Sequence, residues 1–460
     1  MDIKKLYALY RQCPSLTTDS RECPEGSMFL ALKGDKFDGN AFARQALEKG
    51  CRWAIVDTPQ EGAPVYDLRD GAPAPALRED KGGYLVVDDT LQTLKLLARE
   101  HRRQFDIPVV GITGTNGKTT TKELVRAVLS EQYNVLATEG NYNNDVGVPK
   151  TLLRLRPEHE VAIIEMGASH PGDIKTLAET AEPTCGLITN VGRAHLEGFG
   201  SFEGVCRTKG ELYDYLRTRK DGLVFVNADS DELVDMLTDD LWCTPYSTDP
   251  EKQYTCISAE VLEGDIFLRF RWRRPLIYLE ETGASQKWHK VQTQVIGAYN
   301  IYNMLAAIAV GINFGIDRKQ ICHALENYRP TNNRSQLTDT ARNRLVVDAY
   351  NANPSSMGAA LENFAMIQAP HKMLILGDMR ELGEASAEEH QRIVDYIATM
   401  EDVSEVWLVG SEFARTRHDF RSFADVGEVK AAIADEQPEG RLILIKGSNS
   451  MHLYELPELL

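Results

Sequence analysis

A glycine-rich turn over residues 113–120 could bind the phosphate chain of a nucleotide. It lies between an apolar run that ends at Ile112 and a helical pattern that begins near Lys122, and it reads Thr113-Gly114-Thr115-Asn116-Gly117-Lys118-Thr119-Thr120. Glycines let backbone N–H groups approach phosphate oxygens, and a helix N-terminus adds positive potential. Lys118 could reach the terminal phosphates, and the Thr119 hydroxyl could ligate Mg²⁺. The glycine spacing differs from the common P-loop and a bare Gly-Lys-Thr is usually a surface turn, but the strand before it and the helix after it favour a phosphate loop.

Two further strands of the same predicted sheet end near residues that could hold a metal ion. The strand Val161–Ile164 ends at Glu165, and the strand Leu187–Thr189 leads to His195. Ligands of open parallel sheets bind beyond the carboxyl ends of the strands, so we expect both side chains near the phosphate loop. A carboxylate suits Mg²⁺, and a neutral imidazole could complete the metal shell. A turn cap and an ordinary loop histidine are the alternatives, and the neighbouring phosphate loop favours the metal site.

Amide side chains are concentrated in two other places. The loop with Asn141, Asn143 and Asn144 could offer hydrogen bonds to a polar ligand, and asparagine-rich turns are an equally good interpretation. Asn300 opens a buried helix, where it could read the edge of a purine or simply cap the helix. Lys209 lies on a predicted helix over 201–216, and composition alone indicates a solvated surface lysine.

The last third of the chain offers a second set of polar residues. The strand ending at Asp348 is suited to ribose hydroxyls. Its polar continuation, with Asn351 and Asn353, leads into a helix, where capping is the alternative role. Arg334 follows Pro330 at a predicted domain junction and could reach across a cleft to phosphate, or it could be a plain surface arginine.

The pattern of strands and helices predicts three α/β domains. Residues 1–88 form a small N-terminal domain, with 59–83 as a loop or insertion rich in proline, glycine and charge. Residues 89–330 form a central P-loop-type domain with a mostly parallel sheet flanked by helices, and residues 331–460 form a Rossmann-like domain. The alternation of apolar and basic residues at 267–272 favours a two-faced antiparallel hairpin over a nucleic-acid surface.

The composition excludes several classes of protein. The 460 residues carry a net charge of −17, which argues against nucleic acid as the main partner. No apolar run approaches membrane-spanning length, and no signal peptide is visible. The eight cysteines include no Cys-x-x-Cys pair, as expected for thiols in a reducing compartment, so we expect a cytoplasmic protein without a membrane span.

Taken in order, these motifs resemble the Mur ligases, the ATP-dependent amide-forming enzymes of peptidoglycan synthesis in cell wall biogenesis. The resemblance covers nearly the whole chain. It is carried by TGTNGKTTT (113–121), DSRECPEGSMFLALKGDKFDGN (19–40), GNYNNDVGVPKTLLRL (140–155), AHLEGFGSFEGVCRTKGEL (194–212), DAYNANPSSM (348–357) and LGDMRELG (376–383). Within the family, these stretches are most similar to the member that joins D-alanyl-D-alanine to UDP-N-acetylmuramoyl-tripeptide.

The resemblance implies a role for each position. Asn300 would contact the adenine of ATP, Arg334 would contact a phosphate, and Asp348 would contact the ribose. The phosphate chain would be held by the loop residues Gly114, Thr115, Asn116, Gly117, Lys118, Thr119 and Thr120. Thr119, Glu165, His195 and a carbamylated Lys209 would hold Mg²⁺, two ions in all. Tyr350, Asn351 and Asn353 would lie near the incoming dipeptide, with the asparagine loop as a further substrate contact. The UDP-sugar would bind at Ser20, Arg21, Lys33 and Gly34.

The implied reaction phosphorylates the peptide carboxylate at the Lys118 turn, and the dipeptide amine then attacks the acyl phosphate. Catalysis would rest on Lys118, Lys209, Glu165 and His195 in an enzyme that we expect to be a monomer. A sibling ligase with another amino-acid substrate is the nearest alternative. A folylpolyglutamate synthase is disfavoured by the 19–40 stretch, and a P-loop switch that ligates nothing is the alternative from another class.

Overall fold

The computed structural model describes residues 2–34, 36–72, 82–252, 254–262, 266–275, 287–330 and 336–460. The chain divides into two units. The first comprises Met1–Val109, Leu136–Met166 and Thr176–Pro183, and the second comprises Val110–Val135, Gly167–Lys175 and Thr184–Leu460. Each unit is described by itself.

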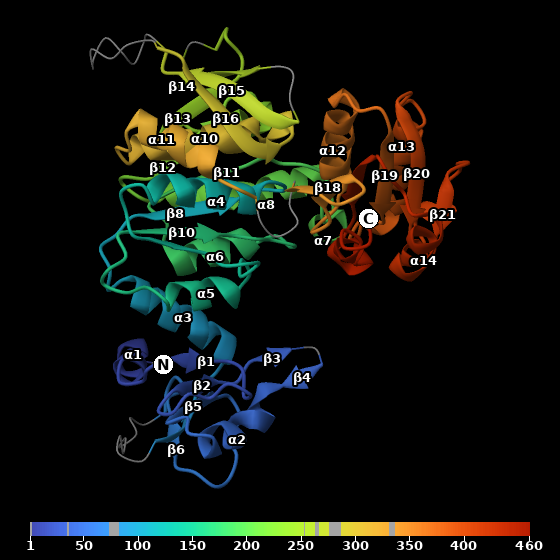
Figure 1. Ribbon diagram of the computed structural model, residues 1–460. Coiled ribbons are helices and arrows are strands. Elements are labelled where there is room, and N and C mark those ends of the chain that lie inside the picture. The colour runs from blue at the N-terminus through green and yellow to red at the C-terminus, as the bar shows by residue number, and fades with distance from the viewer. Residues whose placement is uncertain are drawn as a thin grey trace. The chain divides into compact units, whose positions relative to one another are not determined.

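The N-terminal part of the first unit is built on a five-stranded parallel sheet (Figure 1). Its order is β1-β2-β5-β7-β6, with bounds Leu16–Thr17, Met28–Leu30, Trp53–Val56, Gly83–Val86 and Val65–Asp67. Strand β6 lies inside the stretch 59–83, so of the predicted loop or insertion the structure shows an insertion with a strand of its own; three residues are too few for periodicity to reveal that strand. The short pair β3 (Lys33–Gly34) and β4 (Phe37–Asp38) is antiparallel.

The first unit also contains helices that bury one histidine. The helices are α1 (Ile3–Tyr10), α2 (Ala43–Glu48), α3 (Thr90–Arg102) and α5 (Gly147–Leu152). His101 on α3 lies 3.0 Å from the Tyr7 hydroxyl through Nδ1 and 3.1 Å from the Leu155 carbonyl through Nε2. Because a carbonyl only accepts, Nε2 carries the proton and Nδ1 accepts from the tyrosine. Burial lowers the pKa of His101, which is therefore held in the neutral form.

The central sheet has nine strands, in the order β16-β15-β14-β13-β12-β11-β8-β10-β9. The pairs that join β8, β11, β12, β13 and β14 are parallel, and β15 and β16 add an antiparallel hairpin. In chain order from β8 to β16 the bounds are Val109–Thr113, Val135–Ala137, Val161–Glu165, Cys185–Ile188, Leu223–Asn227, Trp242–Ser247, Ile257–Leu262, Phe267–Arg273 and His289–Ile296. Buried and half-exposed residues alternate along β15, which confirms the two-faced hairpin predicted for this stretch.

Helices of two kinds accompany the central sheet. The long ones are α4 (Lys118–Leu129), α6 (Asp173–Ala181), α8 (Phe202–Arg217), α10 (Ile301–Asn313) and α11 (Arg318–Asn327), and the short ones are α7 (Leu196–Phe199) and α9 (Asp231–Asp235). Helix α10 is buried over nearly all of its length, as its continuous apolar sequence predicts.

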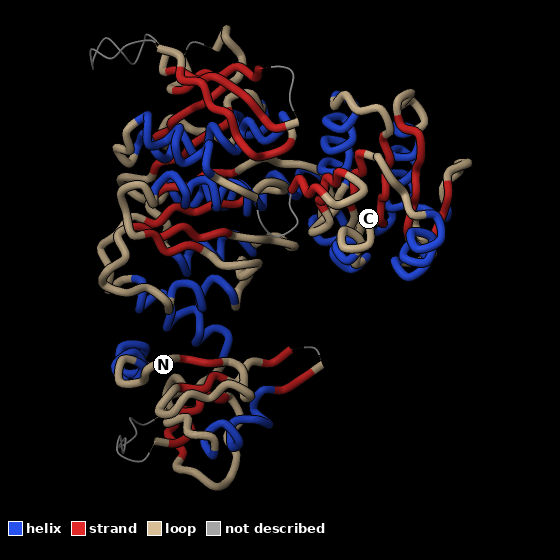
Figure 2. Tube along the Cα trace, viewed as in Figure 1, coloured by secondary structure: helices blue, strands red, loops and turns tan. Residues whose placement is uncertain are grey.

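The C-terminal part of the second unit is a six-stranded sheet between two layers of helices (Figures 1 and 2). The order is β17-β18-β22-β19-β20-β21, with bounds Gln336–Asp339, Arg344–Asp348, Leu442–Lys446, Lys372–Gly377, Val403–Val409 and Arg421–Phe423. Only the edge strand β17 pairs antiparallel among these described strands. Helices α12 (Pro354–Met366) and α13 (Ser386–Ile397) pack on one face, and α14 (Val426–Glu436) packs on the other. The three sheets confirm the predicted α/β fold class.

Candidate active site

The phosphate loop depends on two glycines in left-handed backbone conformations. Gly114 has φ +141°, and a Cβ there would lie 2.0 Å from Thr189 Oγ1. Gly117 has φ +76° and occupies the N-cap of α4, which therefore begins at Lys118. The prediction of a helix start near Lys122 was wrong because the polar residues at 118–121 hide the first helical turn from the apolar pattern.

The turn after β11 clamps the phosphate loop. The Thr115 N–H donates to the Asn190 carbonyl at 2.9 Å, and the Asn116 N–H donates to Asn190 Oδ1 at 3.0 Å. The Thr189 hydroxyl donates to the Asn116 carbonyl at 2.6 Å. Neither Thr189 nor Asn190 was proposed as a site residue from the sequence. The rule that ligands bind at strand ends could have found them, since they directly follow a buried strand.

The two lysines proposed from the sequence lie close enough to affect each other. Lys118 Nζ donates to the carbonyls of Gly114 and Thr115 at 2.8 and 2.9 Å, while Thr119 is buried in the first turn of α4. Lys209 on α8 is only 2 % exposed, so its interpretation as a solvated surface lysine is wrong. Burial, and then the charge of Lys118, lowers the pKa of Lys209 to about 7.

His195 lies in a left-handed conformation, φ +51°, and its Nδ1 pairs with the carboxylate of Glu381 from the C-terminal sheet. This contact lowers the pKa of Glu381. A second ion pair joins Arg193 to the buried Glu389 at 3.2 Å. No sequence pattern singles out Glu381 beyond its place in the motif at 376–383. Among the described residues, no group of three or more His, Cys, Asp or Glu side chains could hold a metal ion.

In the first unit, Glu165 ends β10 and is 1 % exposed. Its Oε1 accepts a hydrogen bond from the Asn143 side chain at 2.9 Å. Asn144 Oδ1 accepts from the N–H of Gly147 at 2.8 Å, so this asparagine supports the start of α5, as the turn alternative predicted. Asn141 is exposed, and its carbonyl accepts from the Asn143 N–H at 2.7 Å.

Two buried amides connect α10 to α4. Asn300 stands at the N-cap of α10, but its side chain makes no capping bond, so the capping alternative is wrong. Its Nδ2 donates to the Ile296 carbonyl at 2.7 Å, and its Oδ1 accepts from Asn303 at 2.7 Å. Asn303 Oδ1 in turn accepts from the Thr121 hydroxyl at 3.0 Å. Asn303, one turn beyond Asn300, is thus a neighbour of the phosphate loop.

The loop after β18 meets the phosphate loop through a pair of amides. Asn353 Nδ2 donates to Asn116 Oδ1 at 2.7 Å, and Asn116 Nδ2 returns a longer bond of 3.4 Å. Asn353 also caps α12, with its Oδ1 accepting from the Ser356 N–H at 2.9 Å, which confirms the capping alternative for this residue. Tyr350 is half-buried and Asn351 is exposed in the same loop. Arg334 lies outside the described residues.

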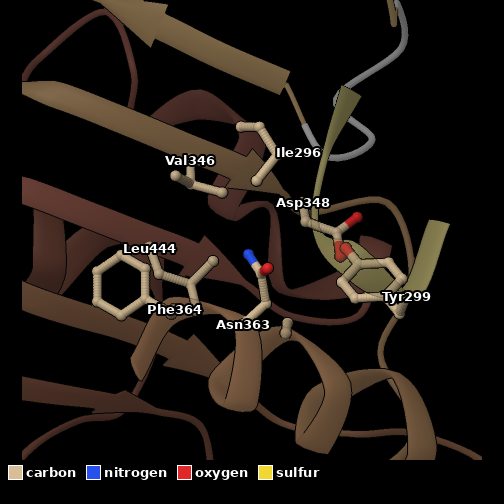
Figure 3. A pocket seen from close by; sticks show the side chains of 8 residues that line it. Ile296, Tyr299, Val346, Asp348, Asn363, Phe364 and Leu444 are labelled. Carbon is tan, nitrogen blue, oxygen red and sulfur yellow. The ribbon is translucent and has the colours of Figure 1, made fainter. Parts of the chain in front are cut away.

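A small cavity lies where α12, β18 and the 3-10 turn Ala298–Asn300 meet (Figure 3). Its polar rim is formed by Asp348, Tyr299 and Asn363, and its remaining lining is apolar: Ile296, Val346, Ala360, Phe364 and Leu444. Asn363 Oδ1 accepts from the Ala298 N–H at 3.2 Å, which joins α12 to this turn. Asp348 thus stands at the end of its strand beside a partly apolar recess.

The residues proposed for the UDP-sugar lie in the loop after β1 and on β3 of the first unit. Lys33 Nζ pairs with Asp57 Oδ1 at 2.8 Å, and Gly34 is its neighbour on β3. Arg21 is exposed and forms a two-pronged contact with Asp19, whose pKa falls to about 2 through hydrogen bonds from Arg21. The Ser20 carbonyl accepts from Lys49 Nζ at 2.7 Å.

Comparison with known proteins gives three family matches along the chain. Residues 14–102 match the model described as "Mur ligase family, catalytic domain", 112–311 match "Mur ligase middle domain", and 333–449 match "Mur ligase, glutamate ligase domain". The chain belongs to the Mur ligase family. In the part of this Mur ligase that the structure describes, no helix is both long and apolar enough to cross a membrane.

Relatives of this Mur ligase match it over nearly its full length. UDP-N-acetylmuramoyl-tripeptide--D-alanyl-D-alanine ligase of Escherichia coli is 33 % identical and that of Bacillus subtilis is 30 % identical, and each match covers 96 % of this chain and 92 % of the relative. A crystal structure of MurF from Acinetobacter baumannii is 28 % identical, with a TM-score of 0.84 over 99 % of this chain and 97 % of that one.

Proposed function

We propose that this Mur ligase joins D-alanyl-D-alanine to UDP-N-acetylmuramoyl-tripeptide with ATP, through an acyl phosphate, and releases UDP-N-acetylmuramoyl-pentapeptide, ADP and phosphate. The function agrees with that of the relatives matched over the whole chain. The observation that carries the proposal is the clamped phosphate loop, where Lys118 at the start of α4 lies near the buried Lys209. That arrangement suits phosphoryl transfer, in which positioning and charge stabilisation do most of the work.

In the first step, a carboxylate oxygen of the tripeptide attacks the γ-phosphorus of ATP, the new O–P bond forms, and ADP leaves. Backbone N–H groups of residues 114–119 and the ammonium of Lys118 are proposed to hold the β- and γ-phosphates. Asn300 is proposed to contact adenine, and Asp348 the ribose. Arg334 is proposed as a phosphate contact from the C-terminal domain.

Magnesium is proposed to bind at Thr119, Glu165, His195 and a carbamylated Lys209, and it supplies positive charge that stabilises the transferring phosphoryl group. The donor set fits this ion, because hydroxyl and carboxylate oxygens are ligands that Mg²⁺ prefers. Lys209 also fits, since a pKa of about 7 leaves much of the amine uncharged and able to react with CO₂.

In the second step, the free amine of D-alanyl-D-alanine attacks the acyl carbon, the amide bond forms, and phosphate leaves. Tyr350, Asn351 and Asn353 are proposed to bind the dipeptide, and Asn353 is already joined to the phosphate loop. Water must be kept from the acyl phosphate because hydrolysis would release it.

The remaining assignments complete the proposal. Ser20, Arg21, Lys33 and Gly34 are proposed to bind the UDP-sugar, with Asn141, Asn143 and Asn144 as further substrate contacts. The domains are proposed to span 1–88, 89–330 and 331–460. The enzyme is proposed to act as a cytoplasmic monomer without a nucleic-acid partner, and sedimentation of the purified chain tests the monomer.

The function is tested by measuring phosphate release while one reactant at a time is omitted. We expect release only when ATP, UDP-N-acetylmuramoyl-tripeptide and D-alanyl-D-alanine are all present, together with a pentapeptide product identified by its mass. The Lys118→Ala variant should keep its fold and form no product. Undiminished product from a folded Lys118→Ala variant would contradict the proposed chemistry.

Two other outcomes would replace the proposal. If the enzyme joins a single amino acid to its UDP-linked acceptor and does not join D-alanyl-D-alanine, it is a sibling ligase. If ATP is hydrolysed slowly with neither acceptor present and no amide forms, the chain is a nucleotide switch.

A further inference from the structure

A buried lysine lies at the carboxyl end of the C-terminal sheet, beside two of the residues assigned above. Lys446 is the last residue of β22, and its side chain is 1 % exposed. Its Nζ donates to Asp348 Oδ2 at 2.5 Å and to the Asn351 carbonyl at 3.2 Å. The parallel register of β18 and β22 pairs Asp348 with Lys446, so both side chains end at the same edge of the sheet.

This ammonium is poorly explained by stability alone. Removing a charge from water is costly, and an apolar side chain of similar volume often stabilises a protein as well as a buried ion pair does. Lys446 nevertheless lies at the edge where open parallel sheets bind their ligands. A charge retained at such a place indicates a role in arranging the groups around it.

Lys446 holds the loop 348–353 at two points. It holds the first residue by the carboxylate of Asp348 and a middle residue by the carbonyl of Asn351. The last residue, Asn353, is held by Asn116 and by its capping bond. With one carboxylate oxygen on Lys446, Asp348 stands at the rim of the cavity next to Tyr299 (Figure 3).

We propose that Lys446 is a positioning residue that sets the ribose-binding Asp348 and the dipeptide-binding loop in one arrangement through a single buried ammonium. The inference rests on the proposed function. Lys446 does not touch the reactants; it acts through Asp348 and the backbone of Asn351. Loss of the ammonium therefore weakens the binding of ATP and of the dipeptide together, and leaves UDP-N-acetylmuramoyl-tripeptide binding unchanged.

The chain contains a matched control at the opposite end of the same sheet. Lys372 is the first residue of β19, the neighbour of β22, and it is fully buried. Its Nζ donates to the Ala365 carbonyl at 3.0 Å and pairs with Asp402. Lys372 thus has the same kinds of hydrogen-bond partner as Lys446, one carboxylate and one carbonyl, at the amino edge of the strands. Its Nζ also lies 5.6 Å from the centre of the Phe364 ring, and none of its hydrogen-bond partners belongs to the loop 348–353.

The experiment compares Lys446→Met with Lys372→Met by steady-state kinetics in which each of the three substrates is varied in turn. For Lys446→Met we expect the KM for ATP and the KM for D-alanyl-D-alanine each to rise by roughly tenfold, the effect of losing one charged hydrogen bond. The KM for UDP-N-acetylmuramoyl-tripeptide should stay within about twofold. Lys372→Met should lower the thermal midpoint to a similar degree and leave all three KM values near those of the unaltered enzyme.

A further pair of variants isolates the two contacts. Asp348→Asn should raise the KM for ATP but not that for the dipeptide, because the bond from Lys446 to Asn351 remains. Adding Lys446→Met to Asp348→Asn should then raise mainly the dipeptide KM. If Lys446→Met does not accumulate as folded protein, Lys446→Gln, which keeps an N–H donor, should show a smaller rise with the same selectivity.

Unchanged KM values in Lys446→Met would overturn the positioning role. An equal rise for all three substrates, or the same pattern in Lys372→Met, would also overturn it, because both indicate a general loss of stability. Failure of the unaltered enzyme to make pentapeptide would instead overturn the proposed function, so the two failures are distinguishable.

Discussion

Replacing Asn353 by serine should slow the ligase reaction while α12 stays capped. Asn353 makes two kinds of contact: its Oδ1 accepts from the Ser356 N–H at 2.9 Å, and its amide pairs with Asn116 at 2.7 and 3.4 Å. Serine is as good an N-cap as asparagine, but it is too short to keep the amide pair. Asn353→Ala removes both contacts, and Asn116→Ala removes only the pair.

The geometry sets the size of each effect. A neutral hydrogen bond contributes about 1 kcal/mol, and the 3.4 Å bond is weak, so the pair contributes about 1 to 1.5 kcal/mol. If the pair is made in the reacting complex, its loss lowers kcat/KM by roughly five- to tenfold. The lost cap in Asn353→Ala adds about 1 kcal/mol of destabilisation.

The assay follows phosphate release with D-alanyl-D-alanine as the varied substrate and compares it with thermal unfolding of each variant. Asn353→Ser and Asn353→Ala should lose at least as much kcat/KM as Asn116→Ala, since Asn353 is also proposed to bind the dipeptide, and among the three Asn353→Ala should lose the most stability. The double variant Asn116→Ala/Asn353→Ser should be no slower than Asn353→Ser alone, because Asn353→Ser has already removed the amide pair. Normal kinetics in Asn353→Ser would show that the amide pair has no part in catalysis.

Three further predictions address single features of the chain. Lys209, whose pKa is lowered to about 7 by burial and then by the charge of Lys118, should carry a carbamate. Removal of CO₂ should lower the ligase activity, and bicarbonate should restore it. ¹³C-bicarbonate should give a carbamate NMR signal that is absent from an inactive Lys209→Arg variant. Gly114→Ala should lose binding of a non-hydrolysable ATP analogue, measured by calorimetry, because the new Cβ would meet Thr189. As a control, Gly315 also has a positive φ but has open space around it, so Gly315→Ala should lose only about 1 to 2 kcal/mol of stability and keep binding the analogue. Burial holds the pKa of His101 below its ordinary value of 6.5, so this histidine gains a proton in the unfolded chain first as the pH falls. Its contribution to folding stability should therefore be full above pH 6.5 and decline below it. The thermal midpoint of the unaltered protein should drop more between pH 7.5 and 5.5 than that of His101→Gln. A pH response equal to that of His101→Gln would contradict the last assignment.

Local patterns were enough to predict the strands of the candidate site. The strands that end at Thr113, Glu165 and Asp348 are short buried runs, and their polar ends lie at the edge where open parallel sheets generally bind ligands. The glycines at 114 and 117 also indicated a tight turn between strand and helix, because only glycine takes the conformations found at Gly114 and Gly117 without strain.

Contacts between distant residues could not be predicted in the same way. Asn116 and Asn353 are 237 positions apart, and each has a good local explanation, a loop residue and a helix cap, that conceals the bond between them. Lys209 and Lys446 appear as ordinary charged residues in the sequence, and only their burial distinguishes them from surface lysines. Burial of a charged group depends on packing from several elements at once, which a linear pattern does not record.

Helix α12 is bonded to the central part of its unit near both of its ends. At its start, Asn353 bonds Asn116 and the Ser355 hydroxyl accepts from the Arg193 N–H at 3.2 Å, and about 15 Å further along Asn363 accepts from the backbone of Ala298. The backbone of Arg193 bonds α12 while its side chain pairs with Glu389 on α13, so one residue of the loop after β11 contacts both helices on this face of the C-terminal sheet. His195, two residues further along, pairs with Glu381 in the loop after β19, so a substitution in this short loop acts on α12, α13 and the end of β19 together.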